Sequence, residues 1–237
     1  MARRGLFITF EGVEGSGKTT QVRLLARRLR REGIRPLVTR EPGGTPLGDA
    51  LRRVLLDPAS AGMPPLVELL LYSAARADHV QRKILPALER GRVVLCDRYL
   101  GATLAYQGFG RGLPIGLIRQ IHSTGPLALR PDLTILLDLP VEKGLTRAKR
   151  RNVDARTGHE GRFEAESLVF HYLVATGYRR LARSERAWRV VDSSGPPEEV
   201  ADKIARAVLP RLKRLAGSRG TRSRTGARAS GAARRRR

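Results

Sequence analysis

The sequence predicts one α/β domain built on a doubly wound, five-stranded parallel sheet that is flanked by helices. Five apolar runs have the length of strands, and they are nearly continuous in aliphatic residues, as strands buried on both faces of a parallel sheet are. Helical stretches separate these runs, and strand and helix in alternation are typical of this fold class. A chain of 237 residues suits one such domain with an added tail.

The expected elements alternate from the first residues onward. The strands are GLFITFE at 5–11, RPLVTR at 35–40, RVVLCDR at 92–98, DLTILLDL at 132–139 and AWRVVDS at 187–193. Helices are expected at 18–32, 65–90, 115–123, 141–151, 164–183 and 197–215, and glycine-rich turns mark the connections.

Charged residues stand where four of the expected strands end. Because ligands of open parallel sheets bind at the carboxyl ends of the strands, this edge is where a site is expected. The residues concerned are Glu11, Arg40, Glu41, Asp97, Arg98 and Asp138.

The positive charge of the chain is unevenly distributed. Of the 46 basic residues, eight are arginines within 217–237, a segment without acids, which leaves 38 basic against 22 acidic residues in 1–216. This Gly/Ser/Arg-rich tail has almost nothing apolar to bury, so disorder is expected there. A solvated appendage and an arm that binds nucleic acid are both open readings of the tail.

Cysteine usage and hydropathy indicate a cytoplasmic protein without membrane contact. The single cysteine, Cys96, excludes an intramolecular disulfide and suits a reducing compartment. No apolar run approaches the roughly 18–20 residues that a bilayer span needs. The start MARRGLFITF lacks a small-residue cleavage site and is read as mature structure.

The segment GVEGSGKT at 12–19 fits the phosphate-binding pattern GxxxxGK[ST], or P-loop, between an expected strand and an expected helix. Backbone N–H groups and the helix N-terminus face the phosphates of a bound nucleotide, Lys18 reaches the β and γ oxygens, and Thr19 can ligate Mg²⁺. A glycine turn that merely opens a helix is the structural alternative. The ATP-binding residues expected here are Gly12, Val13, Glu14, Gly15, Ser16, Gly17, Lys18, Thr19 and Thr20.

Two arginines at strand ends favour a nucleotide kinase over a GTPase. Arg40 and Arg98 follow the second and third expected strands, so they lie opposite the P-loop. Guanidinium groups bind phosphate bidentately, which suits an acceptor that itself carries a phosphate. Taken singly, either arginine is as readily a solvated surface charge.

Several separated motifs resemble those of the bacterial thymidylate kinases, P-loop nucleoside monophosphate kinases that phosphorylate dTMP with ATP. The resemblance covers residues 6–209 and rests on FEGVEGSGKTTQ, TREPGGTPLG, LLLYSAARADH, CDRYLGATLAYQG, PDLTILLDLPVEKGLTR and RFEAES, in family order. It implies transfer of the γ-phosphate of ATP to dTMP, giving dTDP and ADP in the synthesis of dTTP. It also implies Mg²⁺ as cofactor and a homodimer.

The resemblance implies roles around the acceptor. Glu11 matches an acid near the sugar 3′-OH and Mg²⁺, and Asp97 matches a carboxylate that meets Mg²⁺ through water. Arg40 and Arg98 match the arginines that hold the dTMP phosphate. For the base, Tyr72 matches a residue that stacks on thymine, Arg76 one that donates to O4, and Thr103 one that faces N3. Gln107 matches a residue near the base, and Tyr106 matches a tyrosine that crowds the 2′ position of the sugar.

The P-loop itself has no base between Val13 and Ser16, so positive charge on the transferred phosphoryl group is expected from elsewhere. The segment 147–162, RAKRRNVDARTGHEGR, resembles the family lid. Arg151 is the first candidate for contact with the transferred phosphate and Arg156 the second, while Arg147 resembles a residue that packs on adenine.

Some positions depart from the family pattern. Ala75 and Gly161 replace acids, and Leu173 and Ala175 stand where basic residues are common. Two other readings stay open: a kinase for another deoxynucleotide or a nucleoside, and a P-loop protein that binds nucleic acid and turns over nucleotide only secondarily.

Overall fold

The computed structural model describes residues 5–154 and 161–212, with the backbone alone for 151–154. It contains a five-stranded parallel sheet in the order β2-β3-β1-β4-β5. The strands are β1 Leu6–Glu11, β2 Leu37–Arg40, β3 Val93–Asp97, β4 Leu133–Asp138 and β5 Trp188–Asp192. The parallel sheet that the five apolar runs predict is thereby confirmed.

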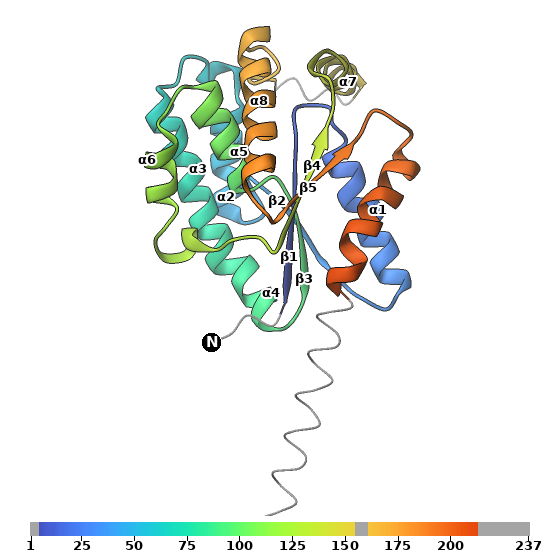
Figure 1. Cartoon of the computed structure of the whole chain (residues 1–237). Coiled ribbons are helices and arrows are strands. Elements are labelled where there is room, and N and C mark those ends of the chain that lie inside the picture. Colours follow the sequence, from blue (N-terminus) through green and yellow to red (C-terminus); the bar gives the residue numbers. More distant parts are fainter. Residues whose placement is uncertain (1–4, 155–160, 213–237) are drawn as a thin grey trace, which may run out of the picture.

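Helices cover both faces of the sheet (Figure 1). They are α1 Lys18–Arg31, α2 Pro46–Leu56, α3 Pro65–His79, α4 Leu85–Glu89, α5 Leu100–Thr103, α6 Ile115–Ile121, α7 Val141–Asp154, α8 Leu168–Ser184 and a last helix at 197–212. Helix α1 and the helix at 197–212 lie on one face, and α3, α5, α6 and α8 lie on the other (Figure 1).

The alternation of side chains along β1 divides the interior into two apolar layers. Leu6, Ile8 and Phe10 pack with α1 and the helix at 197–212, whereas Phe7 packs with α3, α8 and their neighbours. Because successive side chains of a strand point to opposite faces, one continuous apolar strand serves both layers.

Apart from two short 3₁₀ turns at Pro58–Ser60 and Gly125–Ala128, two helical regions in the described part of the chain are not among those expected from the sequence. Thr45 caps the N-terminus of helix α2, because its hydroxyl accepts from Gly48 N, and Pro46 is the first helical residue; this is a recognisable helix start. Residues Leu100–Gly110 form α5 and a π-helical segment. The expected helix at 65–90 is one helical run whose π-helical segment, Val80–Ile84, precedes Pro86, a residue without an N–H for the regular ladder.

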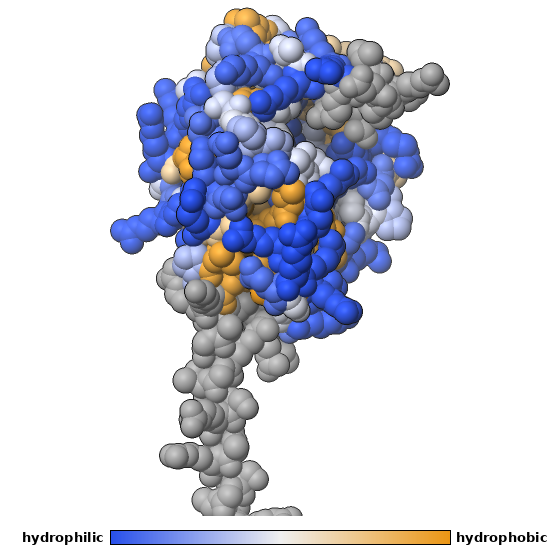
Figure 2. Space-filling model, turned by 90° about the vertical axis from the view of Figure 1, so that its right-hand side faces the viewer, coloured by the Kyte–Doolittle hydropathy of each residue, from blue (hydrophilic) through white to orange (hydrophobic). Residues whose placement is uncertain are grey.

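The face over α1 and the helix at 197–212 is largely hydrophilic (Figure 2). Arginines make much of this surface, since Arg23, Arg27, Arg30 and Arg31 of α1 are exposed. Among the described helices, none combines the length and the apolar character that crossing a bilayer needs.

Candidate functional site

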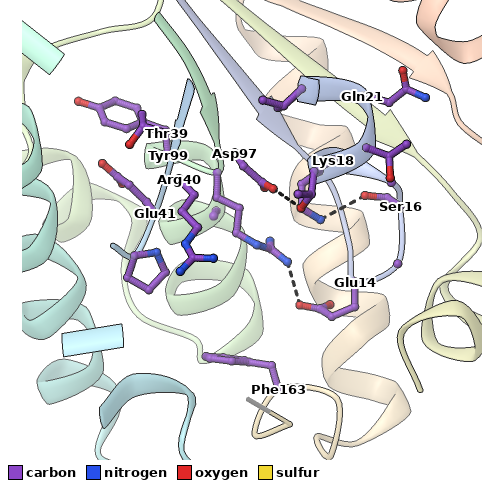
Figure 3. A pocket seen from close by; sticks show the side chains of 18 of the residues that line it. Glu14, Ser16, Lys18, Gln21, Thr39, Arg40, Glu41, Asp97, Tyr99 and Phe163 are labelled. Carbon is purple, nitrogen blue, oxygen red and sulfur yellow. Dashed lines mark hydrogen bonds and ion pairs between the residues drawn. The ribbon is translucent and has the colours of Figure 1, made fainter. Parts of the chain in front are cut away.

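A cleft of about 1160 Å³ opens at the carboxyl ends of β1, β2 and β3. Glu14, Ser16 and Lys18 of the P-loop lie on one side, Thr39, Arg40 and Glu41 of β2 and its continuation lie on the other, and Asp97 of β3 lies between them (Figure 3). The edge of the sheet on which the sequence gathers its charged residues is therefore the edge that carries the cleft.

The P-loop has the shape that a phosphate cradle requires. Gly12, Gly15 and Gly17 have φ angles of 143°, 64° and 90°, a region that favours glycine. The loop leads directly into the N-terminus of α1, whose first residue is Lys18. Unpaired backbone N–H groups and the positive end of the helix dipole therefore face the cleft.

Lys18 is folded onto its own loop. Its Nζ donates to Gly12 O at 2.9 Å, to Val13 O at 2.7 Å and to Ser16 Oγ at 3.2 Å. Burial and the neighbouring Arg98 lower the pKa of Lys18 to about 7, against the opposing charges of Asp97 and Glu14. An anionic ligand in the cleft supplies the negative charge that favours the ammonium form.

Thr19 and Asp97 form the pair that could hold a divalent cation. Thr19 Oγ1 donates to Asp97 Oδ2 at 2.6 Å, although the two residues are 78 positions apart in the sequence. Mg²⁺ prefers oxygen ligands and is bound in nucleotide sites by one or two protein groups together with substrate phosphates. The donor set beside the P-loop fits this ion.

Arg98 reaches into the cleft from a strained backbone. Its φ of 66° lies in the left-handed region, which is uncommon for a residue with a side chain and is found at functional sites. Its guanidinium contacts Gly12 O, Tyr106 Oη and Tyr178 Oη at 3.2, 3.2 and 3.3 Å, and it forms an ion pair with Glu14 Oε1 at 3.1 Å. Arg40 is exposed and also lines the cleft.

The two acids around the P-loop, Glu11 and Glu14, have different surroundings. Glu11 is completely buried and is not among the residues that line the cleft; its carboxylate accepts from Tyr99 N at 2.9 Å and from Tyr178 Oη at 3.1 Å. In this structure Glu11 is therefore shielded from the cleft, and its expected contact with the acceptor sugar stays a prediction. Burial raises the pKa of Glu11 to about 7.

Glu14, expected among the ATP-binding residues, lines the cleft. It accepts from Tyr106 Oη at 2.5 Å and pairs with Arg98. Burial raises the pKa of Glu14, but His171, Arg98 and Lys18 outweigh burial and hold this pKa well below its usual value. Glu14 is thus ionised at neutral pH. It pairs with the guanidinium of Arg98, which an incoming phosphate could also bind.

The wall beyond Arg98 contains the residues that the resemblance assigns to the base. Tyr72, Thr103, Tyr106 and Gln107 all line the cleft. Thr103 is 1 % exposed, and its Oγ1 has no hydrogen-bond partner within the described part of the chain. Since buried hydroxyls are nearly always paired, this one is available to a ligand. Gln107 Nε2 donates to the buried Glu68 Oε1 at 2.8 Å.

Arg76 is held in a buried polar network. Its Nε donates to Glu41 Oε2 at 2.7 Å, its Nη1 donates to His122 Nε2 at 2.8 Å, and its guanidinium lies 5.0 Å from the centre of the Tyr99 ring. His79 Nδ1 lies 3.0 Å from Glu41 Oε1. Arg76 is 2 % exposed and still lines the cleft, so it presents one edge to a ligand.

Helix α7 lies against the P-loop near Gly144 and Arg147, the first residue of the lid-like segment. Arg147 lines the cleft and donates to Ser193 O and Ser194 O, at 3.3 Å each. Arg151 belongs to α7, but its side chain, like the whole of Arg156, lies outside the described residues. Phe163 and Glu164, which follow the segment, also line the cleft.

Three polar residues around the site are not among those singled out from the sequence. His79 contacts Glu41, His122 accepts from Arg76, and Glu68 accepts from Gln107, Arg111 and Arg162. Glu41 itself stands at an expected strand end. His122 and Glu68 meet their partners from distant segments, and only the fold brings them together.

The comparisons with known proteins agree with this geometry. The family model described as thymidylate kinase matches residues 10–204. A thymidylate kinase of Thermomicrobium roseum is 54 % identical over 209 residues, which cover 88 % of this chain and 96 % of that protein. One from Syntrophotalea carbinolica is 51 % identical over 199 residues, which cover 84 % and 92 %.

A solved structure gives the same answer. The crystal structure of thymidylate kinase from Ehrlichia chaffeensis superposes with a TM-score of 0.67 at 29 % identity, and the match covers 86 % of this chain and 98 % of that one. With a family model over most of its length, relatives at half identity and a P-loop cleft of the right construction, the chain belongs to the thymidylate kinase family.

Proposed function

We propose that the protein transfers the γ-phosphate of ATP to dTMP in the cleft at the carboxyl edge of the sheet. The observation that carries the proposal is that two arginines line the same cleft as the P-loop: Arg40 on the β2 side, and Arg98, whose guanidinium pairs with Glu14 of the P-loop. This arrangement suits two anionic nucleotides facing each other, whereas a GTPase needs no second phosphate clamp. Catalysis then rests on positioning and on charge stabilisation, with no covalent intermediate.

ATP is the donor, and its phosphates lie in the P-loop against Gly12–Thr19. Lys18 leaves the loop carbonyls to contact the β and γ oxygens, and Arg147 lies beside the adenine. Thr19 and Asp97, whose side chains already hydrogen-bond at 2.6 Å, hold Mg²⁺ together with the phosphates. The ion neutralises charge on the β and γ phosphates when it is bound.

The acceptor dTMP lies with its phosphate between Arg40 and Arg98. Glu14 lines the cleft beside Arg98, so it is the carboxylate within reach of the acceptor sugar, in place of the buried Glu11. Thymine stacks on Tyr72, and its O4 accepts from Arg76. Thr103 faces N3, Gln107 lies near the base, and Tyr106 fills the space that a 2′-hydroxyl needs.

The lid, residues 147–162, completes the site. Residues Val13–Ser16 offer no cation of their own, so the charge on the transferred phosphoryl group is met by Arg151 or Arg156. An arginine in that role is commonly worth about 10³–10⁵ in rate.

An ADP-release assay tests the acceptor. We expect dTMP to be turned over in preference to dUMP, dCMP, AMP and GMP. Equal or better turnover of a purine monophosphate would refute the proposal. The Arg98→Ala variant separates a nucleotide kinase from a nucleoside kinase, because a nucleoside acceptor has no phosphate for Arg98 to hold and loses little.

A homodimer fits the apolar surface of α2 and α3. Leu66, Val67 and Leu70 of α3 are 45–50 % exposed, and so are Leu47 and Val54 of the adjoining α2. Large side chains that gather in this way on two adjoining helices are typical of an interface.

We also propose that residues 1–216 are the catalytic domain and that any affinity for nucleic acid resides in the Arg-rich segment 217–237. Deleting 217–237 then leaves dTMP turnover intact and abolishes DNA binding together with its salt dependence. If truncation left DNA binding unchanged and dTMP turnover were absent from the full chain, the protein would be a nucleic-acid-binding P-loop protein instead.

A further inference from the structure

The side chain of His122 lies behind the residue to which the proposed function gives the base contact. His122 ends α6, is completely buried, and accepts from Arg76 Nη1 through Nε2 at 2.8 Å. Its Nδ1 lies 2.8 Å from Ile118 O. It is not among the residues that line the cleft, so it does not itself contact a ligand there.

The two contacts fix the protonation of the ring. A carbonyl oxygen can only accept, so Nδ1 carries the proton that it donates to Ile118 O. A guanidinium can only donate, so Nε2 carries the lone pair that receives Arg76. Burial and the charge of Arg76 lower the pKa of His122 to about 4, which keeps the ring neutral at physiological pH.

Arg76 is held from three directions. Glu41 binds Nε on one side, His122 binds Nη1 on another, and the Tyr99 ring lies against the guanidinium plane. With the Glu41 hydrogen bond alone, the guanidinium could rotate about Nε. The second hydrogen bond, to His122, fixes the orientation of the guanidinium, and its remaining N–H groups are left for the cleft.

We propose that His122 is a positioning residue for base recognition: by accepting from Nη1, it orients Arg76 so that the free edge of the guanidinium meets the carbonyl at position 4 of a pyrimidine. The inference rests on the proposed function of Arg76. Two residues, Arg76 of α3 and His122 at the C-terminal end of α6, would then together select a carbonyl over an amino group at position 4 of the base.

The variants His122→Leu and His122→Gln test the proposal. Leucine fills similar space without an acceptor, whereas the glutamine amide reaches the position of Nε2 and can accept from Arg76. For His122→Leu we expect the KM for dTMP to rise about tenfold with kcat nearly unchanged, the scale of one hydrogen bond to a charged group. The preference for dTMP over dCMP should fall by a similar factor, and His122→Gln should restore most of both.

Ile118→Val is the matched control. It trims a buried side chain in the same helix and leaves the carbonyl that holds His122 in place. A loss of thermal stability with the dTMP to dCMP ratio unchanged is expected for this control. The same result for His122→Leu would overturn the inference, because the histidine would then only fill space. Failure of the wild-type protein to phosphorylate dTMP would instead overturn the proposed function.

Discussion

At the scale of single residues, the unpaired hydroxyl of Thr103 links stability to binding. A buried hydroxyl without a partner costs about 1–3 kcal/mol, and a ligand that pairs with it recovers that free energy. Thr103→Val should therefore leave the melting temperature of the free protein unchanged or higher, while the KM for dTMP rises about five- to tenfold. Calorimetry and steady-state kinetics on the same preparation measure both.

Thr134→Val provides the contrast for that experiment. Thr134 Oγ1 and Thr9 Oγ1 already satisfy each other at 3.0 Å inside the sheet. Removing one partner strands the other, so this variant should lose about 1–3 kcal/mol of stability and keep its KM. An unchanged KM in Thr103→Val would show that the hydroxyl does not meet the base.

Glu11 predicts a pH dependence of stability. Its folded pKa of about 7 lies above the ordinary glutamate pKa of 4.5, so between these values the folded protein binds more protons than the unfolded chain. Stability from this group is therefore complete below about pH 4.5 and is lost as pH rises to about 7. Glu11→Gln removes the titration, since its amide can accept from Tyr99 N and donate to Tyr178 Oη.

The measurement is the free energy of unfolding of both proteins between pH 4.5 and 8. The advantage of Glu11→Gln should grow through this window and level off above pH 7 at about 3 kcal/mol. A difference that stays constant with pH would mean that Glu11 titrates normally in the folded state.

At the scale of elements, two glycines let α7 rest on the P-loop. A Cβ on Gly144 of α7 would lie 2.4 Å from Glu14 O, and a Cβ on Gly15 would lie 2.0 Å from Gly144 O. Neither approach tolerates a methyl group, because both neighbours are backbone. The main chain of the P-loop therefore packs directly against the main chain of α7, and this contact fixes the position of α7 relative to the P-loop.

Gly144→Ala should displace α7 and, with it, the arginines that follow. We expect kcat to fall about ten- to hundredfold, since a shift of about 1 Å can cost that much, while the KM for dTMP changes little. Gly116→Ala on α6 is the control, because a Cβ there meets nothing within 4 Å. Equal kcat values for the two variants would contradict the positioning of the lid by this contact.

The elements also explain how much of the site could be predicted. The strand ends fix Arg40, Asp97 and Arg98 at one edge, so a parallel sheet implies their meeting. Glu11 still belongs to the strand whereas Glu14 belongs to the loop, and only the structure shows that Glu14 lines the cleft while Glu11 is buried beneath it. The network of Arg76, Glu41, His79 and His122 joins three segments, and no local pattern predicts it.

At the scale of the whole molecule, the apolar surface of α2 and α3 predicts the assembly. Leu66 and Leu70 are one turn apart on α3 and are 48 % and 50 % exposed. A stable interface buries about 800 Å² on each partner, and a two-fold axis presents the same patch twice. We therefore expect light scattering to give twice the mass of the chain for the wild-type protein.

Leu70→Glu should convert that dimer into a folded monomer, because each copy would bring an unpaired carboxylate into the interface. Since Leu70 is half exposed in the single chain, the circular dichroism spectrum should be unchanged. Leu173→Glu on α8 is the matched control: Leu173 is 45 % exposed but lies on another helix, so this variant should remain a dimer. A dimeric Leu70→Glu protein would show that the interface lies elsewhere. A monomeric wild-type protein would contradict the predicted dimer.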